Sequence, residues 1–274
     1  MPIQLLAIDL DDTLLSHDLS ISQENKAAIA KAEDLGVRVI LASGRSLFSM
    51  KRYIQELKLD QRHGYVISWN GSQISDAQTG DILIQHEMEP DLTELILDWA
   101  IKKHHTLQTQ YRDEMWVMNS NHYSNLDLKL SGMKLVEPTR KEFLVLNHPK
   151  LIVPGEPEQL VGIEAELVDL CGDRVRMFRS KPYFLEIMPP KADKGFALAE
   201  LAQMLSIPRE SIMAVGDSGN DKEMIRFAGV GVAMNNALPE IQAIADWVTT
   251  KDHNNHGLAE AIDRWVLSEP VLSP

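Results

Sequence analysis

The fold is decided by the stretch IQLLAIDLDDT, residues 3–13. An apolar run of strand length ends in Asp9 and Asp11, which indicates a buried strand that leaves its sheet at the carboxyl end. In open α/β sheets, ligands bind at that edge. Two neighbouring carboxylates repel each other unless a cation lies between them, and carboxylate oxygens suit Mg²⁺. The segment therefore points to phosphoryl transfer, with an acidic, solvated turn as the alternative.

The pattern around this stretch predicts an α/β protein. Strand and helix patterns alternate over residues 1–82 and again over 189–274, which is typical of a Rossmann-like core with a parallel sheet. Between them, residues 83–188 combine helical stretches with short strand-like pieces and no regular alternation, as in an α+β domain. We therefore expect one α/β catalytic core, formed by the two outer segments, with an inserted α+β cap domain. Glu186, within one of the short strands, is expected to be solvated, and a hydrogen bond to a polyol is the alternative.

Composition excludes several classes of function. The chain of 274 residues has 40 acidic residues against 27 Lys and Arg, for a net charge of −13. This charge argues against nucleic-acid binding, which needs basic groups to neutralise phosphates. One cysteine excludes an intrachain disulfide or a multi-thiolate zinc site. No segment approaches the roughly 18 apolar residues of a membrane span, and the N-terminus does not resemble a secretory signal. We expect a cytoplasmic protein without a membrane or nucleic-acid partner.

A second acidic segment, VGDSGND at residues 215–221, also follows an apolar strand. Asp217 at its strand end can supply a further oxygen ligand to a cation held between Asp9 and Asp11. Asn220 and Asp221 stand at a predicted helix start, where an acid favours the helix dipole. Capping of that helix is the alternative interpretation.

Two further elements complete the candidate site. Ser43 and Gly44 follow the strand predicted at 37–41, and a hydroxyl with free backbone N–H groups at such a loop can hold an anion. Lys194 opens a predicted helix, where a cation is unfavourable against the dipole, and a locally unfavourable placement suggests a function. An ordinary turn and a solvated lysine are the respective alternatives.

Taken together, these motifs resemble the haloacid dehalogenase superfamily of phosphatases, over essentially the whole chain. The similarity is greatest to the Cof-type members, whose large α/β cap is inserted between the second and third motifs. Asp12 is a departure, because many relatives have Gly there; a third acid could tune metal affinity, and its role stays open. The residues that match the family's motifs are Asp9, Asp11, Ser43, Lys194, Asp217, Asn220 and Asp221.

The resemblance implies a mechanism. Asp9 would attack phosphorus to give an aspartyl-phosphate, and Asp11 would act as general acid and then as general base. Mg²⁺ would be held by the carboxylates of Asp9 and Asp217 and by the backbone carbonyl of Asp11. Asp221 would orient Lys194 or metal-bound water, and Arg45 would either reach the substrate or form an outward salt bridge. The residues that would hold the phosphoryl oxygens are Ser43, Gly44, Lys194 and Asn220.

The predicted activity is Mg²⁺-dependent hydrolysis of a small phosphorylated metabolite, with sugar phosphates favoured, by a monomer or homodimer. A pyridoxal or flavin phosphate as substrate, and transfer to a sugar hydroxyl by a phosphomutase or phosphotransferase, remain open. A receiver-like signalling protein also uses clustered acids around Mg²⁺, but it is shorter and lacks an insert. A catalytically silent ligand-binding protein is disfavoured by the intact set of acids.

The histidines are not expected to bind a metal. His104 and His105 are adjacent, so on a helix they diverge by about 100°. His253 and His256 lie three residues apart, but in a polar loop.

Overall fold

The structure, a computed structural model, describes residues 2–268 and divides the chain into two compact units. Unit 1 consists of Met1–Ile84 with Asp193–Pro274, and unit 2 consists of Gln85–Ala192. The last six residues of the predicted core segment, 269–274, lie outside the described residues, as does Met1. Each unit has its own sheet and its own apolar core.

Unit 1 is built on an eight-stranded sheet of order β14-β13-β12-β1-β2-β3-β4-β5. The six neighbouring strands from β14 to β3 run parallel, and β4 pairs antiparallel with β3. The α/β fold class expected from the sequence is therefore confirmed. The strands of this sheet are β1 (Leu5–Asp9), β2 (Arg38–Ala42), β3 (Tyr65–Ser68), β4 (Gln73–Asp76), β5 (Ile82–Gln85), β12 (Ile212–Gly216), β13 (Val230–Ala233) and β14 (Trp247–Val248).

The register of β1 explains why distant acids meet. In the sheet, β1 lies between β2 and β12, with Asp9 opposite Ala42 and Ile8 opposite Val215. The carboxyl ends of these three parallel strands therefore reach the same edge. Ser43 and Asp217, which follow β2 and β12, emerge beside Asp9.

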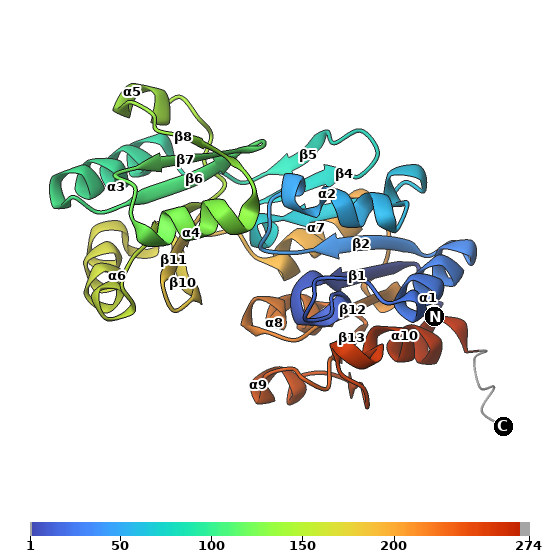
Figure 1. The fold of residues 1–274 in the computed structure, drawn as a ribbon. Coiled ribbons are helices and arrows are strands. Elements are labelled where there is room, and N and C mark those ends of the chain that lie inside the picture. The colour runs from blue at the N-terminus through green and yellow to red at the C-terminus, as the bar shows by residue number, and fades with distance from the viewer. Residues whose placement is uncertain (1, 269–274) are drawn as a thin grey trace. The chain divides into compact units, whose positions relative to one another are not determined.

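Helices cover both faces of this sheet (Figure 1). Alternate side chains of β1 point to opposite faces: Leu6 and Ile8 belong to the core that contains α1, α2 and α10, whereas Leu5 and Ala7 belong to the core that contains α7 and α8. Helix α1 begins after Ser22, whose side chain accepts a hydrogen bond from the backbone N–H of Asn25. The helices of unit 1 are α1 (Gln23–Asp34), α2 (Leu47–Glu56), α7 (Lys194–Met204), α8 (Lys222–Phe227), α9 (Pro239–Gln242) and α10 (Gly257–Ile262).

Unit 2 has a mixed six-stranded sheet of order β10-β11-β9-β6-β7-β8. Helices α3 and α6 contribute apolar side chains such as Leu92, Ile96 and Leu160 to its core. The elements are α3 (Pro90–Lys103), β6 (Leu107–Tyr111), β7 (Glu114–Met118), α4 (His122–Ser131), β8 (Lys134–Val136), α5 (Arg140–Phe143), β9 (Leu151–Pro154), α6 (Pro157–Cys171), β10 (Arg176–Lys181) and β11 (Phe184–Met188).

The sheet of unit 2 contains buried polar side chains. Gln108 on β6 is fully buried, and its Nε2 donates to Asp127 Oδ2 at 2.6 Å. Glu186 on β11 is 5% exposed, and its carboxylate lies 3.2 Å from Lys150 Nζ. The expectation that Glu186 is solvated was wrong, because an alternating strand pattern does not show that a neighbouring strand supplies a buried cation.

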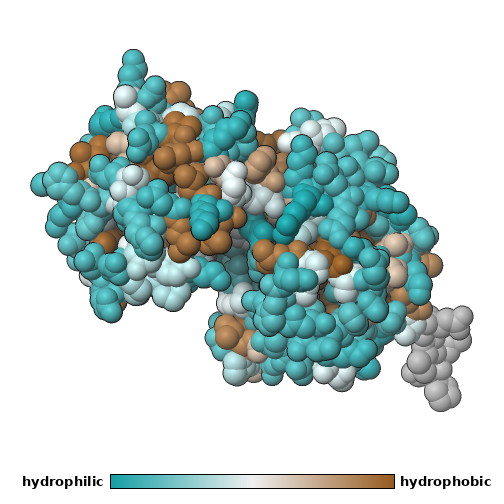
Figure 2. Space-filling model, viewed as in Figure 1, coloured by the Kyte–Doolittle hydropathy of each residue, from teal (hydrophilic) through white to brown (hydrophobic). Residues whose placement is uncertain are grey.

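The surface seen in Figure 2 is largely hydrophilic on unit 1 and carries larger apolar areas on unit 2. Exposed apolar side chains of unit 2 include Leu130, Leu135 and Val145. Within residues 2–268, every helix is too short or too polar to cross a bilayer.

Candidate active site

Lys194 is the centre of a buried charged group in unit 1. It is the first residue of α7 and is fully buried. Its Nζ donates to Asp9 Oδ1 and to Asp221 Oδ1, each at 2.6 Å. Asp9 is 5% exposed and Asp221 is fully buried. The unfavourable position of this lysine at a helix start is thus offset by two direct contacts with carboxylates.

Asp221 and Thr13 fix the third acid, Asp217. Oδ2 of Asp221 accepts hydrogen bonds from the backbone N–H groups of Asp217 and Ser218, each at 3.0 Å. Thr13 Oγ1 donates to Asp217 Oδ1 at 3.1 Å, across 204 residues of sequence. A Cβ atom at Gly216 would lie 2.5 Å from Cβ of Asp221, so the folded-back acid requires glycine there. The acids are therefore held by a rigid, largely buried framework.

The charges in this group do not balance. Carboxylate oxygens of Asp9, Asp217 and Asp221 lie within 4.8 Å of one another, and Lys194 supplies one positive charge. Burial, reinforced by the charge of Asp221, raises the pKa of Asp9 well above its ordinary value, and Lys194 only partly opposes this. Burial and Asp221 likewise raise the pKa of Asp217 to about 7. An all-oxygen donor set with excess negative charge fits a hard divalent cation such as Mg²⁺.

Asp11 has a different environment. Its side chain is 48% exposed, and Arg45 Nε donates to its Oδ2 at 2.9 Å. A second bond joins the Arg45 guanidinium to Oδ1, so the pair is bidentate. Arg45 therefore forms an ion pair with another candidate site residue.

The loop after β2 is joined to the acidic segment through Asn70. The backbone N–H of Asn70 donates to the carbonyl of Ser43 at 3.0 Å, and Asn220 Nδ2 donates to Asn70 Oδ1 at 2.9 Å. Asn70 has a φ of 53°, a left-handed conformation that Asn tolerates. A Cβ at Gly44 would lie 3.0 Å from Asn70 Oδ1. This network places Ser43, Gly44 and Asn220 around one residue, Asn70.

The candidate residues thus form two directly bonded groups. Asp9, Lys194, Asp217 and Asp221 make one, and Ser43, Gly44 and Asn220 are linked by Asn70. The carboxylate of Asp11 lies outside the cluster of three buried acids. Sequence reasoning did not assign a role to Thr13 or to the side chain of Asn70. The available signals were the position of Thr13 within the first acidic motif and the Asn-Gly pair at Asn70, a dipeptide that tolerates a left-handed conformation.

A cavity of about 800 Å³ is found elsewhere, in unit 2. Its lining includes His104, Asn119, Tyr123 and Glu156, all of unit 2. The candidate active site is therefore defined by its chemistry and not by this cavity.

Comparisons with known proteins identify the family of the chain. A model of the haloacid dehalogenase-like hydrolases matches residues 6–262. A Bacillus subtilis protein named 5-amino-6-(5-phospho-D-ribitylamino)uracil phosphatase is 31% identical, over 97% of this chain and 96% of the relative. An HMP-PP phosphatase of Cronobacter sakazakii is 28% identical, over 98% and 97%. The crystal structure of a haloacid dehalogenase-like hydrolase from Bacteroides thetaiotaomicron has a TM-score of 0.88 and 31% identity, covering 96% of this chain and 99% of that one.

Proposed function

The chain belongs to the haloacid dehalogenase-like hydrolases, and on that premise we propose that it is a Mg²⁺-dependent phosphatase of small phosphorylated metabolites. One observation carries the proposal: Lys194 contacts Asp9 and Asp221 at 2.6 Å, at the sheet edge where Asp217 also emerges. This arrangement supplies a carboxylate nucleophile, a fixed cation and spare oxygen ligands together.

Mg²⁺ would be held by the carboxylates of Asp9 and Asp217 and by the backbone carbonyl of Asp11. When bound, it supplies positive charge that offsets the repulsion between the phosphate and the nucleophile. Asp221 would act through Lys194 and the backbone of the 217–218 turn, to which it is bonded. Thr13 would fix the orientation of Asp217.

The chemistry proceeds in two displacements. The carboxylate of Asp9 attacks phosphorus, so that a new O–P bond forms while the P–O bond to the leaving group breaks. Asp11 donates its proton to the departing oxygen, and Asp9 then carries the phosphoryl group. Ionised Asp11 takes a proton from water as the water attacks phosphorus and the Asp9–P bond breaks. Phosphate leaves, and both acids return to their starting forms.

Arg45 must release Asp11 during this cycle. Both carboxylate oxygens of Asp11 accept hydrogen bonds from Arg45, so neither can exchange a proton with the leaving oxygen or with water while the pair persists. We infer that the substrate's phosphate competes for Arg45 when it binds. The two earlier interpretations of Arg45, as a salt-bridge partner and as a substrate contact, then describe two stages of one cycle.

We propose that the inserted residues, 83–188, act as a cap that selects the leaving group of the substrate. The support is that Gln85–Ala192 forms a unit with its own sheet and core. Sugar phosphates remain the favoured substrates, in the cytoplasm. Two relatives are named as phosphatases of 5-amino-6-(5-phospho-D-ribitylamino)uracil and of HMP-PP, and the first of these names favours phosphates of uracil-type heterocycles as the second candidate class.

The test is release of phosphate from a panel of esters, with Mg²⁺ and with EDTA. The panel contains p-nitrophenyl phosphate, hexose and pentose phosphates, pyridoxal phosphate, flavin mononucleotide and pyrimidine phosphates. Metal-dependent release with a preference for one class is the expected result. Absence of release from every ester, while Mg²⁺ binds, would overturn the phosphatase and favour a mutase.

Product analysis separates hydrolysis from transfer. A phosphomutase forms an isomeric sugar phosphate and is activated by a sugar bisphosphate, whereas a phosphatase forms free phosphate without it. Asp11→Asn is expected to slow both displacements and to allow a phosphorylated protein to be detected by mass spectrometry. Undiminished turnover in this variant would show that Asp11 is not the acid and base.

A further inference from the structure

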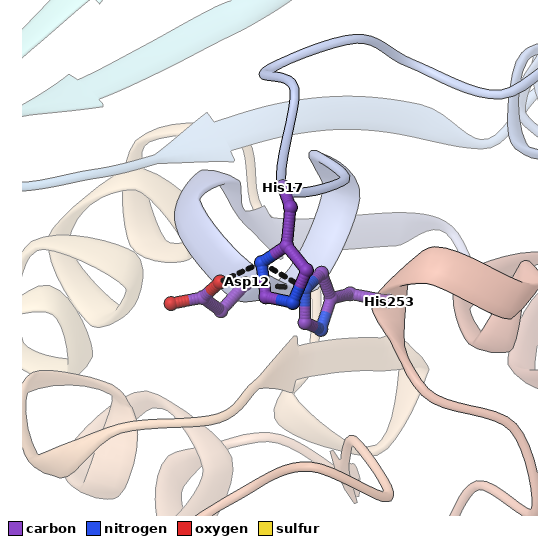
Figure 3. Close-up of side chains that lie close together, drawn as sticks. All are labelled: Asp12, His17 and His253. Carbon is purple, nitrogen blue, oxygen red and sulfur yellow. Dashed lines mark hydrogen bonds and ion pairs between the residues drawn. The ribbon is translucent and has the colours of Figure 1, made fainter.

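Three side chains of unit 1 that the proposed mechanism does not use as ligands meet beside the turn Leu10–Leu14. His253 Nε2 lies 3.4 Å from Asp12 Oδ1 and 3.4 Å from His17 Nδ1, and His17 Nδ1 lies 4.0 Å from Asp12 Oδ1. Figure 3 shows the two rings and the carboxylate lying close together, joined by these contacts. The side chain of His253 is only 6% exposed, whereas those of Asp12 and His17 are 57% and 77% exposed. The group is thus anchored at one side and open at the other.

Hydrogen bonds determine which atom His253 presents to the group. Asn254 Oδ1 accepts from the backbone N–H of His17 at 3.0 Å. Its Nδ2 must therefore face His253 Nε2, which lies 3.0 Å away. Nε2 consequently carries no proton: its single lone pair accepts from Asn254, and a metal ion bound next to the carboxylate oxygen of Asp12 would take the place of that hydrogen bond. A lone pair on imidazole nitrogen is what a metal ion requires of a histidine ligand.

The spacing of the three atoms matches a metal site. A point equidistant from all three atoms lies about 2.1 Å from each, which is the usual distance of Zn²⁺ from imidazole nitrogen and carboxylate oxygen. Two imidazoles and one carboxylate also form the donor set of many open zinc sites. Mg²⁺ prefers oxygen ligands alone, so these donors discriminate against it.

We propose that Asp12, His17 and His253 bind a divalent transition-metal ion of the Zn²⁺ type, with a fourth position open to solvent. The site is distinct in donor chemistry from the cluster of Asp9, Asp217 and Asp221, and it does not depend on the phosphatase activity. It gives Asp12 a role as a ligand.

The ion would join two segments that already contact each other. Asn236 Nδ2 donates to the carbonyl of Asp12 at 2.8 Å, and Asn236 Oδ1 accepts from the backbone N–H of His253 at 3.0 Å. Asp12 has a φ of 58°, a left-handed conformation with a steric cost for residues other than glycine. A bound ion would stabilise this turn and tie it to His253–Asn255, so its binding should raise the thermal stability of the protein.

The experiment uses the full chain, freed of metal with a chelator and then saturated with Mg²⁺ to occupy the oxygen-rich cluster. Zn²⁺ is titrated by calorimetry and by thermal denaturation, and Co²⁺ is used as a spectroscopic probe. His17→Gln and His253→Gln are compared with His256→Gln, a matched control in the same loop whose Nδ1 lies 3.5 Å from Glu24. His253 is buried, so its replacement could disturb the core. His17 is exposed, so the His17→Gln variant tests the site with the core intact.

The wild type and His256→Gln are expected to bind one Zn²⁺, to melt at higher temperature with it and to show the strong visible bands of low-coordinate Co²⁺. His17→Gln and His253→Gln should bind Zn²⁺ at least about tenfold more weakly. Equal binding by these variants and the wild type would overturn the proposal. Loss of Zn²⁺ binding in Asp217→Asn would also overturn it, because the ion would then occupy the oxygen-rich cluster. Absence of Zn²⁺ binding to the wild type would overturn it too, and would leave only a histidine–aspartate ion pair.

Discussion

Two clusters each take one carboxylate from the short segment 9–12 of the chain, yet they have opposite chemistry. The inner cluster consists of Asp9, Asp217 and Asp221, offers only oxygen atoms and is buried around Lys194. The outer cluster consists of Asp12, His17 and His253, offers two imidazoles and is open to solvent. Asp9 and Asp12 are three residues apart. The difference shows that burial and distant partners, more than position in a motif, determine what a carboxylate can bind.

The largest expected effect tests the nucleophile of the inner cluster. Asp9→Asn should lower phosphate release by about 10⁴-fold or more, because the amide cannot attack phosphorus. The fold should persist, since a neutral side chain is less costly to bury and does not repel Asp221, and burial and Asp221 are the two main causes of the raised pKa of Asp9. Activity and urea unfolding are measured together, with the exposed Asp169→Asn as control. More than a tenth of normal activity in Asp9→Asn would end the comparison, because the inner cluster would not be catalytic.

The second prediction removes the cation on which the inner cluster depends. Lys194→Met leaves Asp9 and Asp221 buried without their partner and should lower the free energy of unfolding by about 3–5 kcal/mol. The exposed Lys141→Met should change it by less than about 0.5 kcal/mol. Urea unfolding without metal gives both values. A loss as small as that of the control would mean that these acids are not held as charged groups.

The third prediction separates the two clusters by metal. Asp217→Asn should weaken Mg²⁺ binding about 10–100-fold, comparable to or above the cost of disturbing a ligand's support, while Zn²⁺ binding at the outer cluster stays unchanged. Thr13→Val should produce a smaller effect in the same direction, because it removes the hydrogen bond to Asp217. Calorimetric titration with each ion measures both affinities. Unaltered Mg²⁺ affinity in Asp217→Asn would place that ion elsewhere.

The smallest expected effect concerns Glu33, an acid outside both clusters that shows what burial does without a metal. Its side chain is 6% exposed, with Arg62 3.5 Å away, and burial raises its pKa to about 7. The folded pKa exceeds the unfolded one, so its contribution to stability is present below about pH 4.5 and is lost as pH rises through about 7.

Glu33→Gln should therefore be more stable than the wild type by about 1 kcal/mol near pH 8, after allowance for solvent screening, and no more stable near pH 5. Urea unfolding at the two pH values gives the difference. The exposed neighbour Asp34→Asn is the control. A gain of equal size at both pH values would contradict an origin in ionisation.

The sequence was sufficient for the features that local pattern encodes. Apolar runs ending in acids at 9 and 217 predicted parallel strands with their carboxyl ends at one edge, and the register of β1, β2 and β12 confirms that fold. The roles of Asp9, Asp217 and Lys194 remain predictions, although their side chains do lie together. Strand β6 was not among the short strand-like pieces expected in residues 83–188. Its buried Gln108 and Thr109 are polar, which is typical of surface residues, and their hydrogen-bond partners lie elsewhere in the chain.

The outer cluster could not be found by spacing. His253 was considered only with its neighbour His256, but its contact is His17, 236 residues away. Neither histidine belongs to a motif, and nothing local to either residue indicates the other. Such pairs become visible only when the path of the chain is known, in this case when the turn after β1 meets the loop before α10.

The insertion of unit 2 between the two segments of unit 1 also sets the order in which the two units can fold during synthesis. β1 pairs with both β2 and β12, and a ribosome makes all of Gln85–Ala192 before it makes β12. Domains whose residues are continuous fold as units during synthesis, so the inserted unit should be complete while β1 still has one edge unpaired. Until residues 194–217 are made, Asp9 lacks its partners Lys194 and Asp217. The nascent chain therefore cannot act on phosphate esters before its last third has emerged.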